Sequence, residues 1–194
     1  LPRWNSFTTT SVPMGHEVNV TPLQLARAFC VFANGGKLVQ PHVLRAVLAA
    51  DGRLVKDLSD HPPLGQVLPE EVAAVMRHKI LSEVINKGTG TKAQLARYQV
   101  FGKTGTAQIA RQGGGGYKQR AYVGSFVAGA PAADPQLVVL VEIRRPDPSI
   151  GYYGGTISAP GVRGILAHAL AYLQVPPDKG EDGTAQPSTG VGGD

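Results

Sequence analysis

The sequence predicts an α+β domain of layered architecture, in which an antiparallel sheet is flanked by helices. Three strand-like runs follow one another directly in the second half of the chain, and amphipathic helical periodicity occurs before and after them. The length of 194 residues fits one domain with a core of its own. We expect the strands at 100–110, 121–130 and 137–144 and the helices at 22–34, 69–86 and 160–173.

Local signals mark the ends of the expected helices. Thr21 can cap the first helix in a capping box with Gln24, and Asn34-Gly35-Gly36 can end it. The second helix is expected to stop at Asn86-Lys87-Gly88. The third helix can pack on the sheet through one apolar side, which is formed by Val162, Ile165, Leu166, Ala169, Leu170 and Leu173.

The strand signals differ in kind. Asp51-Gly52 predicts a tight hairpin between two short strands within 38–55. The glycine run 113–116 reads as a turn between the first two strands of the main sheet. The run 137–141 is apolar on both faces, which is typical of a central strand covered on both sides.

Composition and charge separate a domain at 1–175 from a tail at 176–194. The tail is rich in glycine, proline and polar residues, which bury too little apolar surface to offset the entropy of ordering, so we expect it to be disordered. The chain has a net charge of +5, and four of its 14 acidic residues lie in the tail, so the domain favours anionic partners. Aromatic residues are few and no basic run exceeds Arg144-Arg145, so we expect no nucleic-acid partner.

We expect no cofactor and no metal site. The five histidines show no metal-ligand spacing with one another or with Cys30, the only cysteine. Gly102-Lys103-Thr104 matches the end of a phosphate-binding loop, but Arg97 stands where that pattern needs its first glycine. No apolar run reaches the roughly 18 residues that span a bilayer as a helix.

The most informative segment is Lys103-Thr104-Gly105-Thr106-Ala107-Gln108, which falls in an expected strand. It offers an ammonium group, a glycine that permits close approach of another backbone, and two hydroxyl groups on one face, because Thr104 and Thr106 lie two residues apart. On an edge strand, free backbone groups can also pair with an extended peptide. Such a surface suits a peptide with a terminal carboxylate. Taken alone, Lys-Thr-Gly is better explained as a chance tripeptide on an exposed strand.

Several separated segments occur in the same order as in class B penicillin-binding proteins, and the chain resembles their transpeptidase domain. The resemblance covers about residues 1–173 and corresponds to the C-terminal half of such a domain. The sequence contains neither an S-x-x-K nor an S-x-N motif, so it lacks that family's nucleophile. The segments that carry the resemblance are 15–26, 33–36, 88–93, 102–108, Ser125-Phe126, Ala130-Pro131 and Asp134-Pro135.

The resemblance implies a penicillin-binding, β-lactamase-like fold and peptidoglycan cross-linking by serine acyl transfer. It implies that Lys103 lines the cleft and that Gly105 leaves room for the donor peptide. Thr104 and Thr106 would hold the carboxylate of the D-alanyl donor or of a β-lactam. The backbone N–H of Thr106 would be an oxyanion-hole donor.

The implied partners are a stem peptide ending in D-Ala-D-Ala, β-lactams, and an N-terminal half of the domain that supplies the nucleophile. The implied location is the extracytoplasmic face of the bacterial inner membrane, reached through an N-terminal anchor. The chain opens at Leu1 rather than at a methionine, which indicates a piece of a longer protein. A surface that normally faces the other half would then be exposed, so we expect self-association or a domain swap.

Two functions remain open at this point. The chain is either the inactive part of a D,D-transpeptidase or a non-catalytic module that binds peptides or partners in cell-wall assembly. Without an activated nucleophile, neither acylation nor deacylation can begin.

Overall fold

The structure is a computed structural model that describes residues 8–12, 15, 18–113 and 116–180. No helix in these ranges is both long enough and apolar enough to cross a membrane. In chain order the elements are α1 Thr8–Ser11, α2 Pro22–Ala33, β1 Lys37–Leu38, β2 Ala46–Leu48, β3 Leu54–Asp57, β4 Gly65–Gln66, α3 Glu70–Val75, a π-helical turn Met76–Leu81, α4 Ser82–Asn86, a 3₁₀ turn Thr91–Ala93, β5 Phe101–Ala110, β6 Tyr117–Ala130, β7 Leu137–Arg144, α5 Gly154–Ile157 and α6 Ala159–Tyr172.

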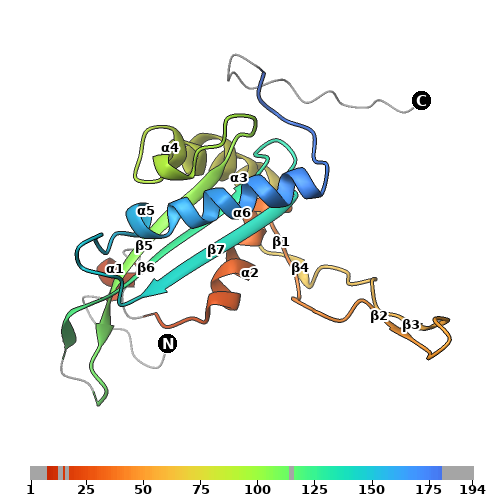
Figure 1. The fold of residues 1–194 in the computed structure, drawn as a ribbon, viewed down its shortest axis with the longest axis horizontal. Coiled ribbons are helices and arrows are strands. Elements are labelled where there is room, and N and C mark those ends of the chain that lie inside the picture. The colour runs from red at the N-terminus through yellow and green to blue at the C-terminus, as the bar shows by residue number, and fades with distance from the viewer. Residues whose placement is uncertain (1–7, 13–14, 16–17, 114–115, 181–194) are drawn as a thin grey trace.

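The main sheet is antiparallel, with the strand order β5-β6-β7 (Figure 1). β6 is central, and its Phe126 lies opposite Thr104 of β5 and Val141 of β7. Among the described residues β7 is therefore an edge strand, and the prediction of a central strand at 137–141 is wrong. Both faces of β7 are nevertheless covered, because alternate residues pack against two different hydrophobic clusters. An apolar run indicates covered faces, but it does not fix the number of neighbouring strands.

The two hydrophobic clusters lie on opposite faces of the sheet. On one face, Phe126 packs with Leu166 and Leu170 of α6, and all three side chains are fully buried. On the other face, Phe101 of β5 stacks on Phe29 of α2, with ring centroids 5.6 Å apart. β5 and β6 are thus fixed between α6 and α2, which makes the sheet a rigid support for any site along β5.

α2 begins as predicted, with a complete capping box. Thr21 Oγ1 accepts a hydrogen bond from Gln24 N at 3.2 Å, and Thr21 N donates to Gln24 Oε1 at 2.8 Å. At the other end, Asn34 N donates to Cys30 O at 3.0 Å. Burial of the Cys30 thiol raises its pKa.

The helix predicted at 69–86 forms as α3, the π-helical turn and α4 in succession. Arg77 in the wide turn ties this helix to the body of the molecule. Its Nε donates to Ala132 O at 2.6 Å, and its Nη1 donates to Phe32 O at 2.8 Å. Burial lowers the pKa of the Arg77 guanidinium.

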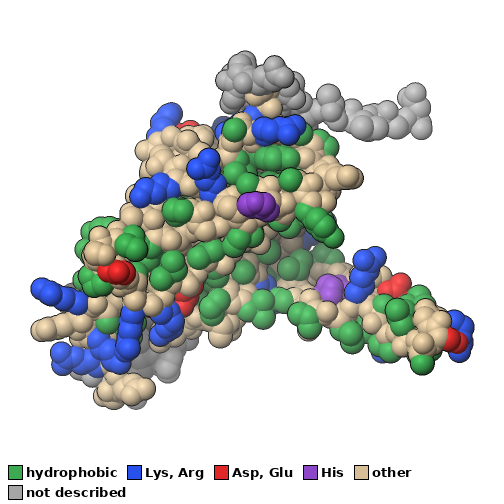
Figure 2. Space-filling view, viewed as in Figure 1, with side chains coloured by type: hydrophobic (Ala, Val, Ile, Leu, Met, Phe, Trp, Pro, Cys, Tyr) green, Lys and Arg blue, Asp and Glu red, His purple; other side chains and the backbone are tan. Residues whose placement is uncertain are grey.

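An arm of short strands extends away from the body (Figure 1). The predicted hairpin at Asp51-Gly52 forms its tip, where β2 and β3 pair antiparallel, and β1 pairs with β4 at its base. Figure 2 shows hydrophobic side chains on the surface of this arm. Its exposed large hydrophobic residues are Val43, Leu44, Val47, Leu48, Leu54, Val55, Leu64 and Val67.

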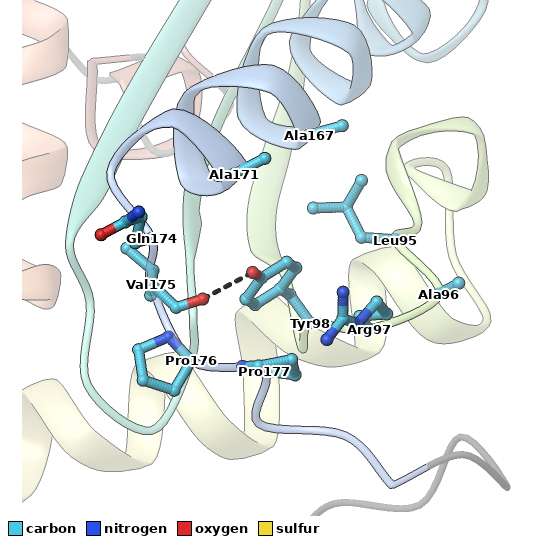
Figure 3. Close-up of a pocket in the computed structure, with 10 residues that line it drawn as sticks. All are labelled: Leu95, Ala96, Arg97, Tyr98, Ala167, Ala171, Gln174, Val175, Pro176 and Pro177. Carbon is cyan, nitrogen blue, oxygen red and sulfur yellow. Dashed lines mark hydrogen bonds between the residues drawn. The ribbon is translucent and has the colours of Figure 1, made fainter.

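Beyond α6 the chain forms a strap, residues 175–179, that lies against the segment 95–99. Tyr98 Oη donates to Val175 O at 2.7 Å (Figure 3). Gln99 N donates to Asp178 Oδ1 at 2.6 Å, although the second oxygen of this carboxylate is buried without a hydrogen-bond partner among the described residues. These hydrogen bonds hold the strap against the segment 95–99.

The strap overlaps the start of the tail expected at 176–194, where Asp178 and Lys179 hydrogen-bond to the segment 95–99. Residues 181–194 lie outside the described part, and the division into a domain and a tail stays a prediction. The glycine turn expected at 113–116 lies partly outside the described residues, which do not include 114–115, so it stays a prediction.

Candidate functional site

The Lys-Thr-Gly-Thr segment lies on β5, which is the other edge strand of the described sheet. Thr104 lies opposite Phe126, so Thr104 and Thr106 face the side of the sheet that carries α6. Lys103 lies opposite Val127, so Lys103 and Gly105 face the side that carries α2. The strand thus brings the two threonines together and directs the lysine to the opposite face.

Thr104 and Thr106 line a pocket of about 320 Å³. Thr104 Oγ1 lies 2.9 Å from Thr89 Oγ1, and either hydroxyl can be the donor. Thr106 Oγ1 accepts a long hydrogen bond, 3.3 Å, from Gly154 N. The complete lining consists of Gly88, Thr89, Thr91, Lys92, Thr104, Thr106, Tyr153, Gly154, Gly155 and Thr156.

Two glycines at the start of α5 allow this wall to approach the sheet. A Cβ atom at Gly154 would collide with the backbone oxygen of Ser125, and one at Gly155 would collide with the backbone oxygen of Thr89. The absence of side chains at both positions therefore sets the width of the pocket.

Lys103 and Gly105 have different surroundings from the threonines. Lys103 is exposed, and its Nζ donates to the neighbouring Thr104 O at 3.0 Å. A Cβ atom at Gly105 would collide with Ser125 Oγ on β6. Within the described chain, Gly105 is thus required by the adjacent strand.

An aromatic group that the sequence did not single out for chemistry borders the pocket. Tyr122 of β6 stacks on Tyr152 with ring centroids 4.1 Å apart, and Tyr152 contacts Tyr153 at 4.4 Å. Tyr152 Oη donates to Tyr153 Oη at 3.1 Å, and this hydrogen bond raises the pKa of Tyr152. The Tyr-Tyr pair before Gly154-Gly155 was visible in the sequence, but its partner Tyr122 lies 30 positions earlier and has no local signal.

The charges around the pocket favour an anion. Lys92 is the one lysine or arginine among the lining residues, and no aspartate or glutamate lines the described pocket. None of the described hydroxyl groups in the pocket is hydrogen-bonded to a lysine, histidine or carboxylate that could act as a base. The described residues contain no group of three or more histidine, cysteine, aspartate or glutamate side chains that could hold a metal. Hydroxyl donors, one ammonium group and an open strand edge can bind a carboxylate, but they do not activate a nucleophile.

Solved structures with this fold support a comparison with whole domains. The transpeptidase domain of penicillin-binding protein 3 from Burkholderia pseudomallei superposes with a TM-score of 0.75 at 30% identity, over 91% of this chain and 50% of that one. Penicillin-binding protein 3 from Mycobacterium tuberculosis, solved in complex with ampicillin, gives a TM-score of 0.79 at 28% identity, over 96% of this chain and 42% of that one.

Curated relatives agree with the structural match. The chain is 36% identical over 185 residues to the probable peptidoglycan D,D-transpeptidase PbpC of Pseudomonas aeruginosa, covering 94% of this chain and 30% of that protein. It is 37% identical over 169 residues to the stage V sporulation protein D of Bacillus subtilis, covering 86% and 25%. The chain therefore spans less than a third of the length of these two relatives.

The family model for the penicillin binding protein transpeptidase domain matches residues 1–167, which is most of the chain. This match confirms the resemblance read from the separated sequence segments. The chain belongs to the penicillin-binding protein transpeptidase domain family.

Proposed function

We propose that this chain forms one wall of a peptidoglycan D,D-transpeptidase active site and holds the terminal carboxylate of a peptide there. The observation that carries the proposal is the pocket in which the hydroxyls of Thr104 and Thr106 meet Lys92, with no acidic side chain among the described lining residues. A carboxylate accepts hydrogen bonds from hydroxyl groups and gains from a nearby ammonium group. Membership of the transpeptidase family supports a peptide ending in D-Ala-D-Ala, or a β-lactam, as the ligand.

In this proposal the residues of β5 have different roles. Thr104 and Thr106 bind the carboxylate, and the backbone N–H of Thr106 is an oxyanion-hole donor. Lys103 starts on the opposite face of the strand and reaches the edge of the cleft with its Nζ, which donates to Thr104 O. Gly105 keeps the strand edge open to the donor peptide. Penicillin-binding protein 3 from Mycobacterium tuberculosis has been solved in complex with aztreonam and in complex with ampicillin, which supports β-lactams as ligands of the complete domain.

The proposed chemistry needs residues that this sequence does not contain. Acyl transfer requires a nucleophile next to a base, and the sequence has no S-x-x-K motif. We therefore propose that this chain binds the donor and that an N-terminal half of the domain supplies the serine and its lysine. The whole protein would work at the extracytoplasmic face of the bacterial inner membrane, where stem peptides are cross-linked.

Binding of acetyl-D-Ala-D-Ala tests the carboxylate site. Amide chemical shifts of the isotope-labelled chain are followed during titration with this peptide and, as a matched control, with its C-terminal amide. We expect the acid to shift resonances of β5 and of the loop 88–92 more strongly than the amide does. Thr104→Val and Thr106→Val keep the side-chain shape and should each weaken binding about ten-fold, since each removes a hydrogen bond to a charged group.

Ser59→Ala on the arm serves as the control substitution, because Ser59 bonds only locally to Asp57. Equal binding of the acid and the amide, or threonine variants that bind like the Ser59 variant, would refute the proposed carboxylate site.

A further inference from the structure

The segment Gly88-Thr89-Gly90-Thr91, which we call the Gly-Thr-Gly-Thr loop, follows α4 and runs into the 3₁₀ turn. It is one of the segments that resemble the transpeptidase family, but binding of a carboxylate by Thr104 and Thr106 leaves it without a role. Three of its four residues nevertheless line the same pocket as these two threonines. The loop is therefore part of the site by position.

The backbone of the loop is fixed against α4 and the sheet. Gly90 N donates to Val84 O at 2.9 Å, and Gly88 N donates to Glu83 O at 3.0 Å. A Cβ atom at Gly90 would lie 2.8 Å from the ring of Phe126, which is fully buried in the sheet. The glycine at this position therefore allows the loop to lie directly on the sheet.

Contact with α5 fixes Thr89 from the other side. A Cβ atom at Gly155 would collide with Thr89 O, so the start of α5 packs closely against this residue. The packed loop brings Thr89 Oγ1 to 2.9 Å from Thr104 Oγ1, and within the described chain neither hydroxyl group bonds to another residue. The pair keeps one proton free for a ligand, because two hydroxyl protons serve one hydrogen bond between them.

The second hydroxyl group of the carboxylate site is ordered by a backbone donor. Gly154 N donates to Thr106 Oγ1 at 3.3 Å, and a backbone N–H can act only as a donor. Thr106 therefore keeps its own proton for a ligand. Thr89 can do the same for Thr104, since a hydroxyl group that accepts a hydrogen bond on one side becomes a stronger donor on the other.

We propose that Thr89 is a positioning residue of the carboxylate site. It donates its proton to Thr104 Oγ1 and thereby directs the Thr104 proton toward the bound carboxylate. This inference rests on the proposed function, because Thr104 must hold that carboxylate. Thr89 acts through Thr104 rather than by its own contact with the ligand, and the Gly-Thr-Gly-Thr loop gains a function in binding.

A double-mutant cycle tests whether Thr89 acts through Thr104. Acetyl-D-Ala-D-Ala is titrated into the parent chain, Thr89→Val, Thr104→Val and the double variant, and binding is followed by amide chemical shifts. We expect Thr89→Val to weaken binding about three-fold, because it removes a hydrogen bond that strengthens another one rather than a bond to the ligand. In the Thr104→Val background, Thr89→Val should have no further effect.

The Thr106→Val background provides the matched comparison. Because Gly154 rather than Thr89 orders Thr106, Thr89→Val should weaken binding there by the same factor as in the parent chain. Thr89→Ser keeps the hydroxyl group and should bind like the parent chain. Thr10→Val, at an exposed threonine of α1, is the control for the substitution itself and should leave binding unchanged.

The outcomes separate this inference from the proposed function. The parent chain reports on the carboxylate site alone: if it binds the acid no better than the C-terminal amide, the proposed function fails and the role of Thr89 fails with it. If the acid is preferred but Thr89→Val binds like the parent chain, the carboxylate site stands and the positioning role is refuted.

A purely structural role of Thr89, or a direct contact with the ligand, gives a different pattern. Thr89→Val would then weaken binding by the same factor in the parent chain and in the Thr104→Val and Thr106→Val backgrounds, and the proposal would be overturned. Loss of the effect with Thr104→Val alone supports it.

Discussion

At the scale of single residues, the two threonines and the glycine of the Lys-Thr-Gly-Thr segment contact different parts of the chain. The alternation of a strand was enough to place Thr104 and Thr106 on one face. It could not reveal that Thr89 and Gly154 bond their hydroxyls, because those residues are 15 and 48 positions away. The sequence explained Gly105 by the space that a bound peptide needs. The described chain shows a second reason for a glycine at this position, because a Cβ atom would collide with Ser125 Oγ.

This contact predicts the effect of Gly105→Ala on stability. The new methyl group must displace Ser125 Oγ, so we expect a loss of about 1–3 kcal/mol in the free energy of unfolding, measured by urea denaturation. Removing the hydroxyl group with Ser125→Ala leaves the next nearest side-chain atom at 3.8 Å, which is an ordinary contact. The double variant Gly105→Ala/Ser125→Ala should therefore recover most of the loss. If the double variant loses as much as both single variants together, the collision with Ser125 is not the cause.

At the scale of elements, α2 was predictable because its signals are local. Its ends carry their own signals: Thr21 and Gln24 form the capping box at the start, and Asn34 caps the end. The buried residues of α6 form a narrow stripe of Ala159, Val162, Leu166 and Leu170, whereas Ile165 and Leu173 are about half exposed. The apolar pattern of the sequence overstated the width of this face, because it cannot say how closely the sheet approaches.

The strap shows the limit of composition as a signal. Its prolines and charged residues give no sign of fixed contacts, but Asp178 and Lys179 bond to a loop about 80 positions earlier. Such long-range hydrogen bonds leave no local pattern in the sequence.

The hydrogen bond from Tyr98 to the strap predicts a specific change in local opening. Tyr98→Phe keeps the ring and removes only the hydroxyl that donates to Val175 O. We expect a loss of about 0.5–1.5 kcal/mol in local stability, seen as faster amide hydrogen exchange in the strap. Tyr172→Phe is the matched control, since Tyr172 is 87% exposed. If exchange in the strap accelerates equally in both variants, Tyr98 does not anchor it.

At the scale of the whole molecule, the described residues form a three-stranded sheet that is covered on both faces and has β5 and β7 as its edge strands. The sequence indicated layers correctly, because each layer has its own periodicity. The sequence could not predict the order of the strands within the sheet, because strand pairing depends on contacts between distant segments. The expected self-association stays a prediction, although the exposed hydrophobic side chains of the arm favour it.

The same scale governs reactivity toward β-lactams, because acylation needs a nucleophile and a base from one assembled cleft. After incubation with excess benzylpenicillin, we expect the intact mass of this chain to equal that of an untreated control. A full-length relative with an S-x-x-K motif, treated in parallel, should gain one adduct. A stoichiometric adduct on this chain would mean that one of its own hydroxyl groups is activated, and the division of labour proposed above would be wrong.

The shared hydrogen bond between Thr89 and Thr104 has a thermodynamic consequence. A hydroxyl group has one proton to donate. If Thr104 donates its proton to a bound carboxylate, Thr104 can only accept in its hydrogen bond with Thr89, and Thr89 must be the donor. The loop that begins at Thr89 also carries Lys92, which lines the same pocket, so under the proposed function a bound carboxylate fixes the proton of this loop's first hydroxyl group. Linkage requires this effect to be reciprocal: a change in the loop that favours Thr89 as the donor to Thr104 raises the affinity of the pocket for a carboxylate by the same factor.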